Sequence, residues 1–265
     1  MKFSIVANTK QENIREILKK VIGFVEDFEL DKVTADFLGL HGVEIKDLSG
    51  DVIISLGGDG TILHILSQIN KPILGINFGG VGFLNELEPD SDILTAIDNV
   101  IHKKYFEEKL HRIDTYLNDL NVGTAVNEIV LHTSRVAKIQ GFEISTNGKL
   151  IDSFRGDGVI IATPTGSTSY SMSIGAPIIY PTMESNLIVP MAPYKLGSRP
   201  LILPANYDIS AKINGHPEAV MVIDGKEEIF IKGDDKIEFK ASNNPATLIR
   251  FSKNFFDRLR NKLRL

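Results

Sequence analysis

Residues 51–69 read DVIISLGGDGTILHILSQI, and this stretch decides the fold of the first part of the chain. A continuous apolar strand pattern runs into glycines, and a helix pattern follows at 61–69. A strand without polar alternation is typical of a parallel sheet whose two faces are both covered by helices. Strand and helix patterns alternate around it in the same way, at 3–8, 11–28, 71–84 and 91–108. The first hundred residues therefore predict an α/β domain built on a parallel sheet.

The pattern changes after about residue 108. Short strand patterns follow one another there, and Asn147-Gly148 and Asp224-Gly225 each separate two of them. Such dipeptides favour tight hairpin turns because both central residues can adopt positive φ. One helical interruption lies near 167–175, and the tail 253–265 has the pattern of a basic amphipathic helix that docks on another part of the protein. The second part therefore predicts an antiparallel β domain.

The composition excludes several classes of protein. The chain has 265 residues, 29 Lys and Arg against 34 Asp and Glu (net charge −5), and no cysteine. It therefore has no disulfide framework, thiolate nucleophile or cysteine-ligated metal, and its six histidines lack metal-ligand spacing. No apolar run approaches the length of a spanning helix, and the apolar run at the N-terminus is shorter than a signal-peptide core. The acidic balance disfavours a nucleic-acid surface. We expect a cytoplasmic protein that binds neither membrane nor nucleic acid.

The loop between the strand and the helix of the opening stretch consists of Gly57, Gly58, Asp59, Gly60 and Thr61. Glycines let the backbone approach a ligand closely, and a helix N-terminus attracts an anion. Ligands of parallel sheets bind outside the carboxyl ends of the strands, so the loop predicts a phosphate site in an acidic chain. Asp59 would repel a phosphate unless it binds a metal or accepts a proton from a hydroxyl. The alternative is that Asp59 only caps the helix.

A second glycine-rich turn reads NFGGVGFL at 77–84 and follows the next strand pattern. Strands of a parallel sheet end at one edge, so this turn predicts a second wall of the same crevice, with Phe83 beside it. The alternative is a plain turn in which Phe83 and Leu84 pack in the core.

A polar pair, Asn127-Glu128, interrupts a strand pattern in the second part of the chain. An amide beside a carboxylate can hydrogen-bond both ribose hydroxyls and the edge of a base. The alternative is a pair that faces solvent.

The most unusual stretch reads RGDGVIIATPTGSTSYSMSIGAP at 155–177. Six hydroxyl-bearing residues lie within seven positions, 165 and 167–171, at a turn that opens a short helix. Capping of the helix accounts for one or two of these hydroxyls. The remainder suit a polyhydroxylated ligand such as a nucleotide ribose, and Tyr170 offers a flat face to a ring.

These motifs, in this order, resemble the NAD kinase family, which makes NADP with ATP or polyphosphate as donor. The resemblance rests on GGDGT, the N-x-G-x-x-GFL turn, the NE pair and GDG-x₄-TPTGSTSY, and it covers most of the chain. It implies a Rossmann- or phosphofructokinase-like α/β domain at 1–108 and a C-terminal antiparallel β-sandwich at 109–239 that binds NAD. The segment from about 240 to 265 would return to pack on the first domain. It also implies Mg²⁺ or Mn²⁺ held mainly by the phosphate donor, with no metal site of the protein's own, and a homodimer or homotetramer.

The resemblance also assigns roles to single residues. Asp59 matches the general base that acts on the 2′-hydroxyl of the adenosine ribose. Asn127 and Glu128 match the pair that binds NAD, and Asp157 is expected at the nicotinamide end. The other implied NAD or ATP contacts are Gly57, Gly58, Gly60, Thr61, His64, Phe83, Lys138, Arg155, Thr165, Thr168, Ser169, Tyr170, Ser171, Met172, Ser173 and Ala192. Ser169 replaces an alanine of the family pattern, and Lys226 aligns only loosely with a further contact.

Two other functions use part of these motifs. A lipid or sugar kinase would share GGDGT but would have no use for the NE pair and TPTGSTSY. A non-catalytic dinucleotide sensor would bind NAD(H) without turnover and would have no use for Asp59.

Overall fold

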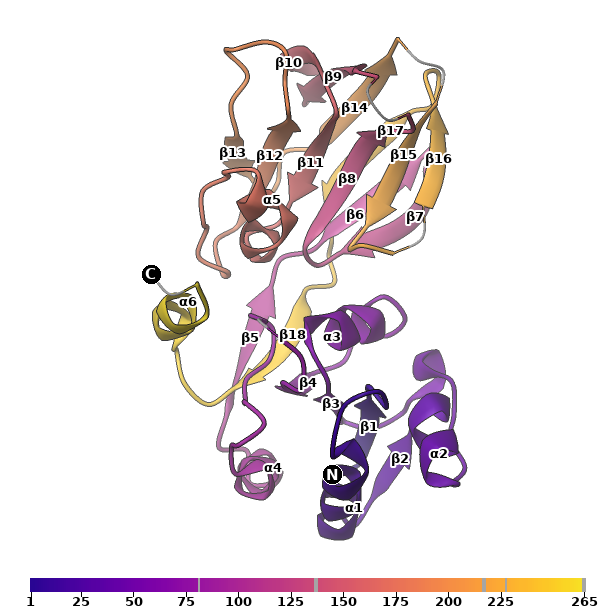
Figure 1. Cartoon of the computed structure of the whole chain (residues 1–265), viewed down its shortest axis with the longest axis vertical. Coiled ribbons are helices and arrows are strands. Elements are labelled where there is room, and N and C mark those ends of the chain that lie inside the picture. The colour runs from indigo at the N-terminus through magenta and orange to yellow at the C-terminus, as the bar shows by residue number, and fades with distance from the viewer. Residues whose placement is uncertain (81, 136–137, 216–217, 227, 264–265) are drawn as a thin grey trace. The chain divides into compact units, whose positions relative to one another are not determined.

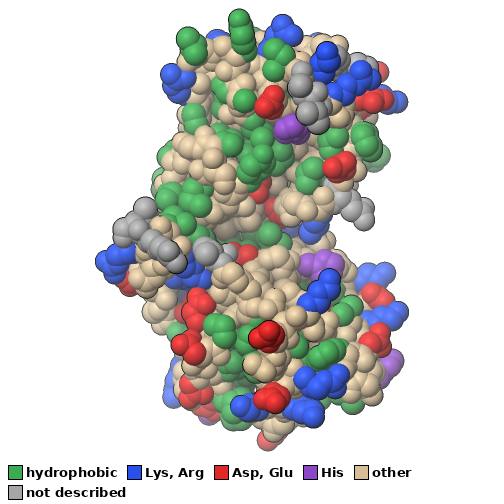
Figure 2. Space-filling view, in the orientation of Figure 1, with side chains coloured by type: hydrophobic (Ala, Val, Ile, Leu, Met, Phe, Trp, Pro, Cys, Tyr) green, Lys and Arg blue, Asp and Glu red, His purple; other side chains and the backbone are tan. Residues whose placement is uncertain are grey.

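The computed structural model describes residues 1–80, 82–135, 138–215, 218–226 and 228–263, and the chain forms two compact units (Figure 1). Unit 1 comprises Met1–Lys109 together with Ala246–Leu265, and unit 2 comprises Leu110–Pro245. Within the described ranges, no helix combines the length and the apolar character needed to cross a membrane. On the face drawn in Figure 2, acidic and basic side chains are interspersed over both units, with no continuous basic surface.

Unit 1 is built on a six-stranded sheet in the order β2-β1-β3-β4-β18-β5. The pairs β1–β2, β1–β3, β3–β4 and β4–β18 are parallel, which confirms the predicted parallel α/β sheet. The strands are β1 (Phe3–Ala7), β2 (Phe28–Leu30), β3 (Val52–Leu56), β4 (Ile73–Ile76), β5 (Phe106–Leu110) and β18 (Ala246–Arg250). The helices are α1 (Ile14–Phe24), α2 (Lys32–Leu38), the 3₁₀ turn η1 (Ile45–Asp47), α3 (Asp59–Leu66), α4 (Ile93–Ile101) and α6 (Phe255–Leu263).

Helices cover both faces of this sheet. On one face α1 and α4 pack against β1, β3 and β4, for example through Leu18, Ile97 and Leu74, all fully buried. On the other face α3 lies over β4, where a side chain at Gly75 would meet the Ile62 side chain at 2.7 Å. Burial on both faces explains why β3 is a continuous apolar run.

Two predicted helices are too long. The helix predicted over 11–28 ends at Phe24, and the chain then enters β2. The helix predicted over 91–108 ends at Ile101, Lys103 has a φ of 55°, and residues 106–110 form β5 instead. The alternating burial of FEEKL in β5 has the period of a strand, and this signal competes with the helical spacing that precedes it.

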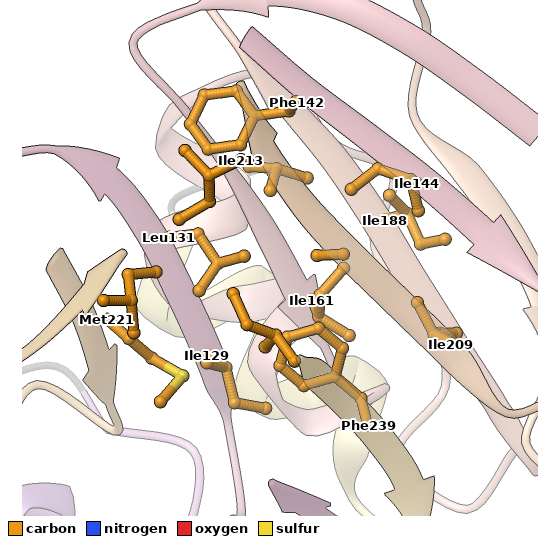
Figure 3. Close-up of a cluster of buried hydrophobic side chains, with 14 of the residues drawn as sticks. Ile129, Leu131, Phe142, Ile144, Ile161, Ile188, Ile209, Ile213, Met221 and Phe239 are labelled. Atoms are coloured by element: carbon orange, nitrogen blue, oxygen red, sulfur yellow. The ribbon is translucent and has the colours of Figure 1, made fainter. Parts of the chain in front are cut away.

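Unit 2 contains two six-stranded sheets in the orders β10-β9-β14-β17-β6-β7 and β13-β12-β11-β8-β15-β16. Neighbouring strands in both sheets are antiparallel. One apolar cluster joins side chains of both sheets, among them Phe142 and Phe239 of the first and Ile129 and Ile161 of the second (Figure 3). The sheets therefore pack face to face, which confirms the predicted antiparallel β domain. The first sheet has β6 (Ile113–Leu117), β7 (Leu120–Ala125), β9 (Gln140–Thr146), β10 (Lys149–Gly156), β14 (Ile209–Asn214) and β17 (Ile237–Ala241). The second has β8 (Glu128–Thr133), β11 (Gly158–Ala162), β12 (Ser185–Met191), β13 (Leu201–Pro204), β15 (Glu218–Ile223) and β16 (Glu228–Lys232).

The two predicted hairpin turns of unit 2 are confirmed. Asn147 and Gly148 have φ of 47° and 75° between the antiparallel strands β9 and β10, and Asp224 and Gly225 have 48° and 67° between β15 and β16. The helical interruption predicted near 167–175 consists of a 3₁₀ turn, η2 (Thr165–Thr168), and a short helix, α5 (Tyr170–Ser173).

The C-terminal segment returns to unit 1. Strand β17 still pairs with β14 and β6 in unit 2, and the return begins at Ala246. There β18 lies between β4 and β5 in the sheet order, and α6 follows as the helix of the predicted tail, whose residues 264–265 lie outside the described part of the chain.

Candidate functional site

The GGDGT loop joins the end of β3 to the start of α3 and needs its glycines for space. A side chain at Gly57 would overlap the Thr61 hydroxyl, and one at Gly58 would meet the Gly79 carbonyl at 3.2 Å. Gly58 and Gly79 therefore bring the first and second glycine-rich motifs into close backbone approach. Val81 of the second motif lies outside the described residues.

A cavity of about 510 Å³ opens beside this loop within unit 1. Its lining includes Gly58, Gly60, Thr61, His64 and Gly79. Gly58 stands at the N-cap of α3 and has no side chain to cap the helix, so backbone N–H groups of its first turn are available to an anion. The cavity is therefore suited to a phosphate-bearing ligand.

The Asp59 carboxylate accepts hydrogen bonds from the loop at residues 83–85. Phe83 N donates to Oδ2 (2.6 Å), while Leu84 N (3.1 Å) and Asn85 Nδ2 (2.9 Å) donate to Oδ1. Asp59 is the first residue of α3 and follows the N-cap, so these bonds do not cap its own helix. Phe83 is half-buried and contributes its backbone N–H to this arrangement.

In unit 2, the Asn127-Glu128 backbone is held by the hairpin turn that joins β15 to β16. The Asp224 carboxylate accepts from Val126 N (2.8 Å), Asn127 N (2.8 Å) and Glu128 N (3.0 Å). Burial raises the pKa of Asp224, and these three N–H donors oppose that rise. The Asp224-Gly225 turn, which the sequence identifies only as a hairpin turn, therefore fixes the backbone of the NE pair.

The hydroxyl-rich turn packs directly on the NE pair. Asn127 O accepts from Thr163 N (2.8 Å), and Thr163 Oγ1 accepts from Gly166 N (3.1 Å). A side chain at Gly166 would overlap the Asn127 carbonyl, so glycine is required for this approach. Ser169 completes the contact by donating its hydroxyl to Glu128 Oε1 (3.0 Å).

Glu128 is a buried carboxyl group, 6% exposed. Burial raises its pKa to about 7; the Asp224 charge adds to this rise, and the Ser169 hydrogen bond opposes it. Among the described residues, Glu128 Oε2 has no hydrogen-bond partner. Glu128 also lines a cavity of about 610 Å³ together with Tyr170, His132 and Phe230, so two residues of the predicted set, Glu128 and Tyr170, lie at one cavity.

Besides that of Ser169, the serine and threonine hydroxyls from Thr165 to Ser171 divide into two groups. Ser167 donates to Pro164 O and Thr168 to Thr165 O, so these two satisfy local carbonyls as the capping alternative predicts. The hydroxyls of Thr165 and Ser171 are buried and have no partner in the described part of the chain. Met172 is half-buried and Ser173 exposed.

Four other candidates stand apart from this cluster, and a fifth, Lys226, lies close to Asp224 at the turn that holds the NE pair. Arg155 lines a different cavity of about 640 Å³ with Tyr194 and Lys195. Asp157 and Lys138 are exposed, and Ala192 is exposed with a φ of 44°. Lys226 is half-buried, and burial lowers its pKa while the charge of Asp224 opposes that change.

Sequence reasoning missed the residues that hold the candidates in place. Asn85 directly follows the second glycine motif, and the sequence marks Asp224 only as a turn residue. Asp31 also lines the 510 Å³ cavity and is buried, which raises the pKa of its carboxyl group. In the sequence, Asp31 looks like an ordinary N-cap, because it is an acidic residue before a short helix. The structure agrees, since the Asp31 carboxylate accepts a hydrogen bond from Val33 N at the start of α2.

Comparison with known proteins identifies relatives along the whole chain. The ATP-NAD kinase N-terminal domain matches residues 40–105, and the ATP-NAD kinase C-terminal domain matches 126–251. An NAD kinase of Methanosarcina mazei is 40% identical over 257 residues, which cover 94% of this chain and 88% of that protein.

Two solved structures share the fold. An NAD kinase from Archaeoglobus fulgidus in complex with ATP has a TM-score of 0.81 at 27% identity, covering 100% of this chain and 99% of that one. Yeast NADH kinase complexed with NADH has a TM-score of 0.89 at 25% identity, covering 99% and 87%. Since both family domains match in order and the sequence similarity spans nearly the full length, this chain belongs to the NAD kinase family, the phosphotransferases that make NADP.

Proposed function

We propose that this protein transfers a phosphoryl group from ATP to the 2′-hydroxyl of the adenosine ribose of NAD, with Asp59 as the general base. The observation that carries this proposal is the hydrogen bonding of the Asp59 carboxylate. Oδ1 accepts two hydrogen bonds and Oδ2 accepts one, so Oδ2 retains capacity for the proton of a substrate hydroxyl. A carboxylate fixed by three donors is held in a set position toward the substrate hydroxyl.

The 510 Å³ cavity beside the GGDGT loop is the proposed site of the donor phosphates. Backbone N–H groups at the start of α3, glycines that leave space and the nearby His64 support this assignment. Oriented N–H groups would neutralise the charge of the donor phosphates, so a protein of net charge −5 needs no basic surface to bind them.

A divalent metal, Mg²⁺ or Mn²⁺, would be held mainly by the donor phosphates. The described residues contain no group of three acidic or histidine side chains arranged as a metal site. This suits a metal that keeps several waters and binds phosphate oxygens, and it leaves Asp59 Oδ2 to the substrate hydroxyl. The metal would neutralise charge on the transferred group.

Unit 2 is the proposed NAD-binding unit. The orphaned Oε2 of Glu128 and the unpartnered hydroxyls of Thr165 and Ser171 are hydrogen-bonding groups that a nucleotide can satisfy. Tyr170, 43% exposed, offers a face for ring stacking, and the Asn127 amide lies beside Glu128 in sequence. Arg155, Asp157, Lys138 and Ala192 are proposed as outer contacts on the basis of family resemblance.

We also propose three properties that follow from family membership alone. Polyphosphate is proposed as an alternative donor, a homodimer or homotetramer as the assembly, and the cytoplasm as the location. Donor competition and sedimentation equilibrium test the first two.

The test of the function is direct. Purified protein is incubated with ATP, Mg²⁺ and NAD, and NADP is read with an NADP-specific dehydrogenase. Asp59→Asn keeps the size of the side chain and removes the proton acceptor, so we expect turnover to fall by roughly 10²–10⁴-fold. NAD binding by calorimetry serves as the control that the variant is folded. Near-normal turnover in Asp59→Asn removes Asp59 from the role, and no NADP from wild type with either donor overturns the function.

A further inference from the structure

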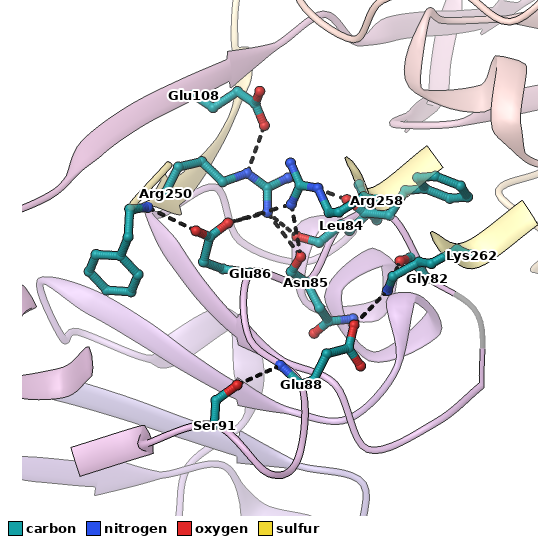
Figure 4. A network of polar contacts seen from close by, with 12 residues as sticks. Gly82, Leu84, Asn85, Glu86, Glu88, Ser91, Glu108, Arg250, Arg258 and Lys262 are labelled. Atoms are coloured by element: carbon teal, nitrogen blue, oxygen red, sulfur yellow. Dashed lines mark hydrogen bonds and ion pairs between the residues drawn. The ribbon is translucent and has the colours of Figure 1, made fainter. Parts of the chain in front are cut away.

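The C-terminal segment supplies three cations to the loop that holds Asp59. Lys262 Nζ donates to the Gly82 carbonyl, and Arg250 Nη2 donates to Phe83 O (3.4 Å). Arg250 Nη1 donates to Leu84 O (3.0 Å) and Asn85 O (3.1 Å), and Arg258 Nη1 also donates to Asn85 O (3.1 Å). Four consecutive carbonyls, 82–85, are therefore each bound by a cation from β18 or α6 (Figure 4).

The other side of the same peptide groups faces Asp59. In the peptide group between residues 82 and 83, the oxygen accepts a hydrogen bond from Lys262, and the N–H donates one to Asp59 Oδ2. In the next peptide group, the oxygen accepts a hydrogen bond from Arg250, and the N–H donates one to Asp59 Oδ1. A cation on the carbonyl polarises a peptide group and strengthens its N–H as a donor, since linked hydrogen bonds reinforce one another at low dielectric.

The cations are themselves paired with carboxylates, of which Glu86 is buried, Glu108 is mostly buried and Glu88 is half exposed. Arg250 Nε contacts Glu108 (2.7 Å), Arg250 and Arg258 share Glu86, and Lys262 pairs with Glu88 (2.9 Å). The side chains of Arg250, Glu86 and Arg258 are only 3%, 3% and 10% exposed. Each cation thus has a set position, and the loop between cations and Asp59 is held from both sides.

The loop approaches Asp59 without any intervening side chain. A side chain at Gly82 would overlap the Asp59 carboxylate, so the backbone at this position lies directly against it. A small shift of the loop must therefore move the carboxylate or break one of its hydrogen bonds.

We propose that Arg250, Arg258 and Lys262 are positioning residues for phosphoryl transfer, which act on Asp59 through the peptide groups of residues 82–85. The proposal rests on the proposed role of Asp59. It assigns to the C-terminal helix α6 a part in catalysis that needs no contact with substrate.

The test is a double-mutant cycle between Lys262 and Asp59. Lys262→Met keeps the length of the side chain and removes the donor to Gly82. In the wild-type background we expect kcat to fall by about 10–100-fold, because a displacement of about 1 Å in a reacting group costs up to about 10² in rate, while KM for NAD and for ATP changes by less than about threefold. In the Asp59→Asn background the same substitution should change kcat by less than about threefold, since the base that it positions is gone.

Matched variants separate positioning from loss of folded protein. Lys2→Met removes another lysine of unit 1 that pairs with a carboxylate, Glu29, away from this loop, and should leave kcat unchanged. If Lys262→Met does not fold, Lys262→Gln, which keeps an uncharged donor, takes its place. We again expect the substitution to lower kcat in the wild-type background and to leave it nearly unchanged in the Asp59→Asn background.

Each outcome decides the proposal. An unchanged kcat, or an equal fall of kcat in both backgrounds, overturns the positioning role even where Asp59→Asn is inactive as expected. Near-normal activity of Asp59→Asn instead overturns the role of Asp59 itself, so the two failures are distinguishable.

Discussion

Glu128 makes the stability of the protein depend on pH near neutrality. Its pKa is about 7 in the folded protein against an ordinary value of 4.5. Between these values the folded state binds more protons than the unfolded state, so the contribution of Glu128 to the free energy of unfolding falls as pH rises from about 4.5 and levels off above about 7. Glu128→Gln, which cannot ionise, should therefore gain stability relative to wild type between pH 5 and pH 8, by about 2–3 kcal/mol.

Urea unfolding of both proteins at the two pH values measures this difference. Asp224 stays in both proteins, so the comparison isolates Glu128. A free-energy difference between variant and wild type that is the same at pH 5 and pH 8 would show that Glu128 is ionised in the folded protein at both.

At the level of residues, the sequence predicted the groups that carry the proposed chemistry and missed those that hold them. Asp59 stands out because a carboxylate in a glycine loop is chemically unusual. Asn85 and Asp224 have ordinary sequence signals, an amide after a turn and an Asp-Gly dipeptide. Their roles depend on contacts between residues that are 26 and 96–98 positions apart, which no local pattern reveals.

At the level of elements, η2 packs closely against the residues at the start of β8. Gly166→Ala places a methyl group against the Asn127 carbonyl, and the resulting overlap should separate the hydroxyl-rich turn from the NE pair. We expect a loss of about 1–3 kcal/mol in the free energy of unfolding, as for overpacked cores, and weaker NAD binding. Calorimetric titration with NAD and urea unfolding measure the two effects.

The control is Gly197→Ala, which has no atom within 4 Å of the added methyl group and no positive φ. It should match wild type in both measurements. Wild-type NAD affinity in Gly166→Ala would show that the close approach is not needed for binding.

The elements that sequence predicted well are those whose pattern has one cause. The hairpin turns follow from the positive φ that Asn-Gly and Asp-Gly allow. The apolar run of β11 could equally indicate a parallel strand, yet β11 is antiparallel, with Val159 and Ile161 in the core between the sheets and Ile160 and Ala162 in a second cluster with Ile179. Burial on both faces, rather than strand direction, produces such a run.

On the scale of the whole molecule, unit 1 is completed by residues that follow unit 2 in the chain. A chain that ends at Pro245 lacks β18, which lies between β4 and β5, and leaves Glu86 and Glu108 buried without Arg250. We expect unit 1 to lose its fold while unit 2, which is continuous, keeps its own. Limited proteolysis with mass spectrometry should then show a protected fragment near 110–245 and rapid cleavage within 1–109.

A chain that ends at Lys253 is the matched comparison, because it keeps β18 and Arg250 and lacks only α6. We expect it to protect both units. Protection of 1–109 in the shorter chain would contradict the structural role of β18.

The place of β18 in the sheet also sets an order of events during synthesis. The first hundred residues leave the ribosome early but cannot close their sheet until the whole of unit 2 and then β18 have been translated. Unit 2 can fold in the meantime, since all of its strands are contiguous in the chain. The loop that holds Asp59 receives its cations last, so in a nascent chain the proposed base lacks this support until translation has passed Lys262.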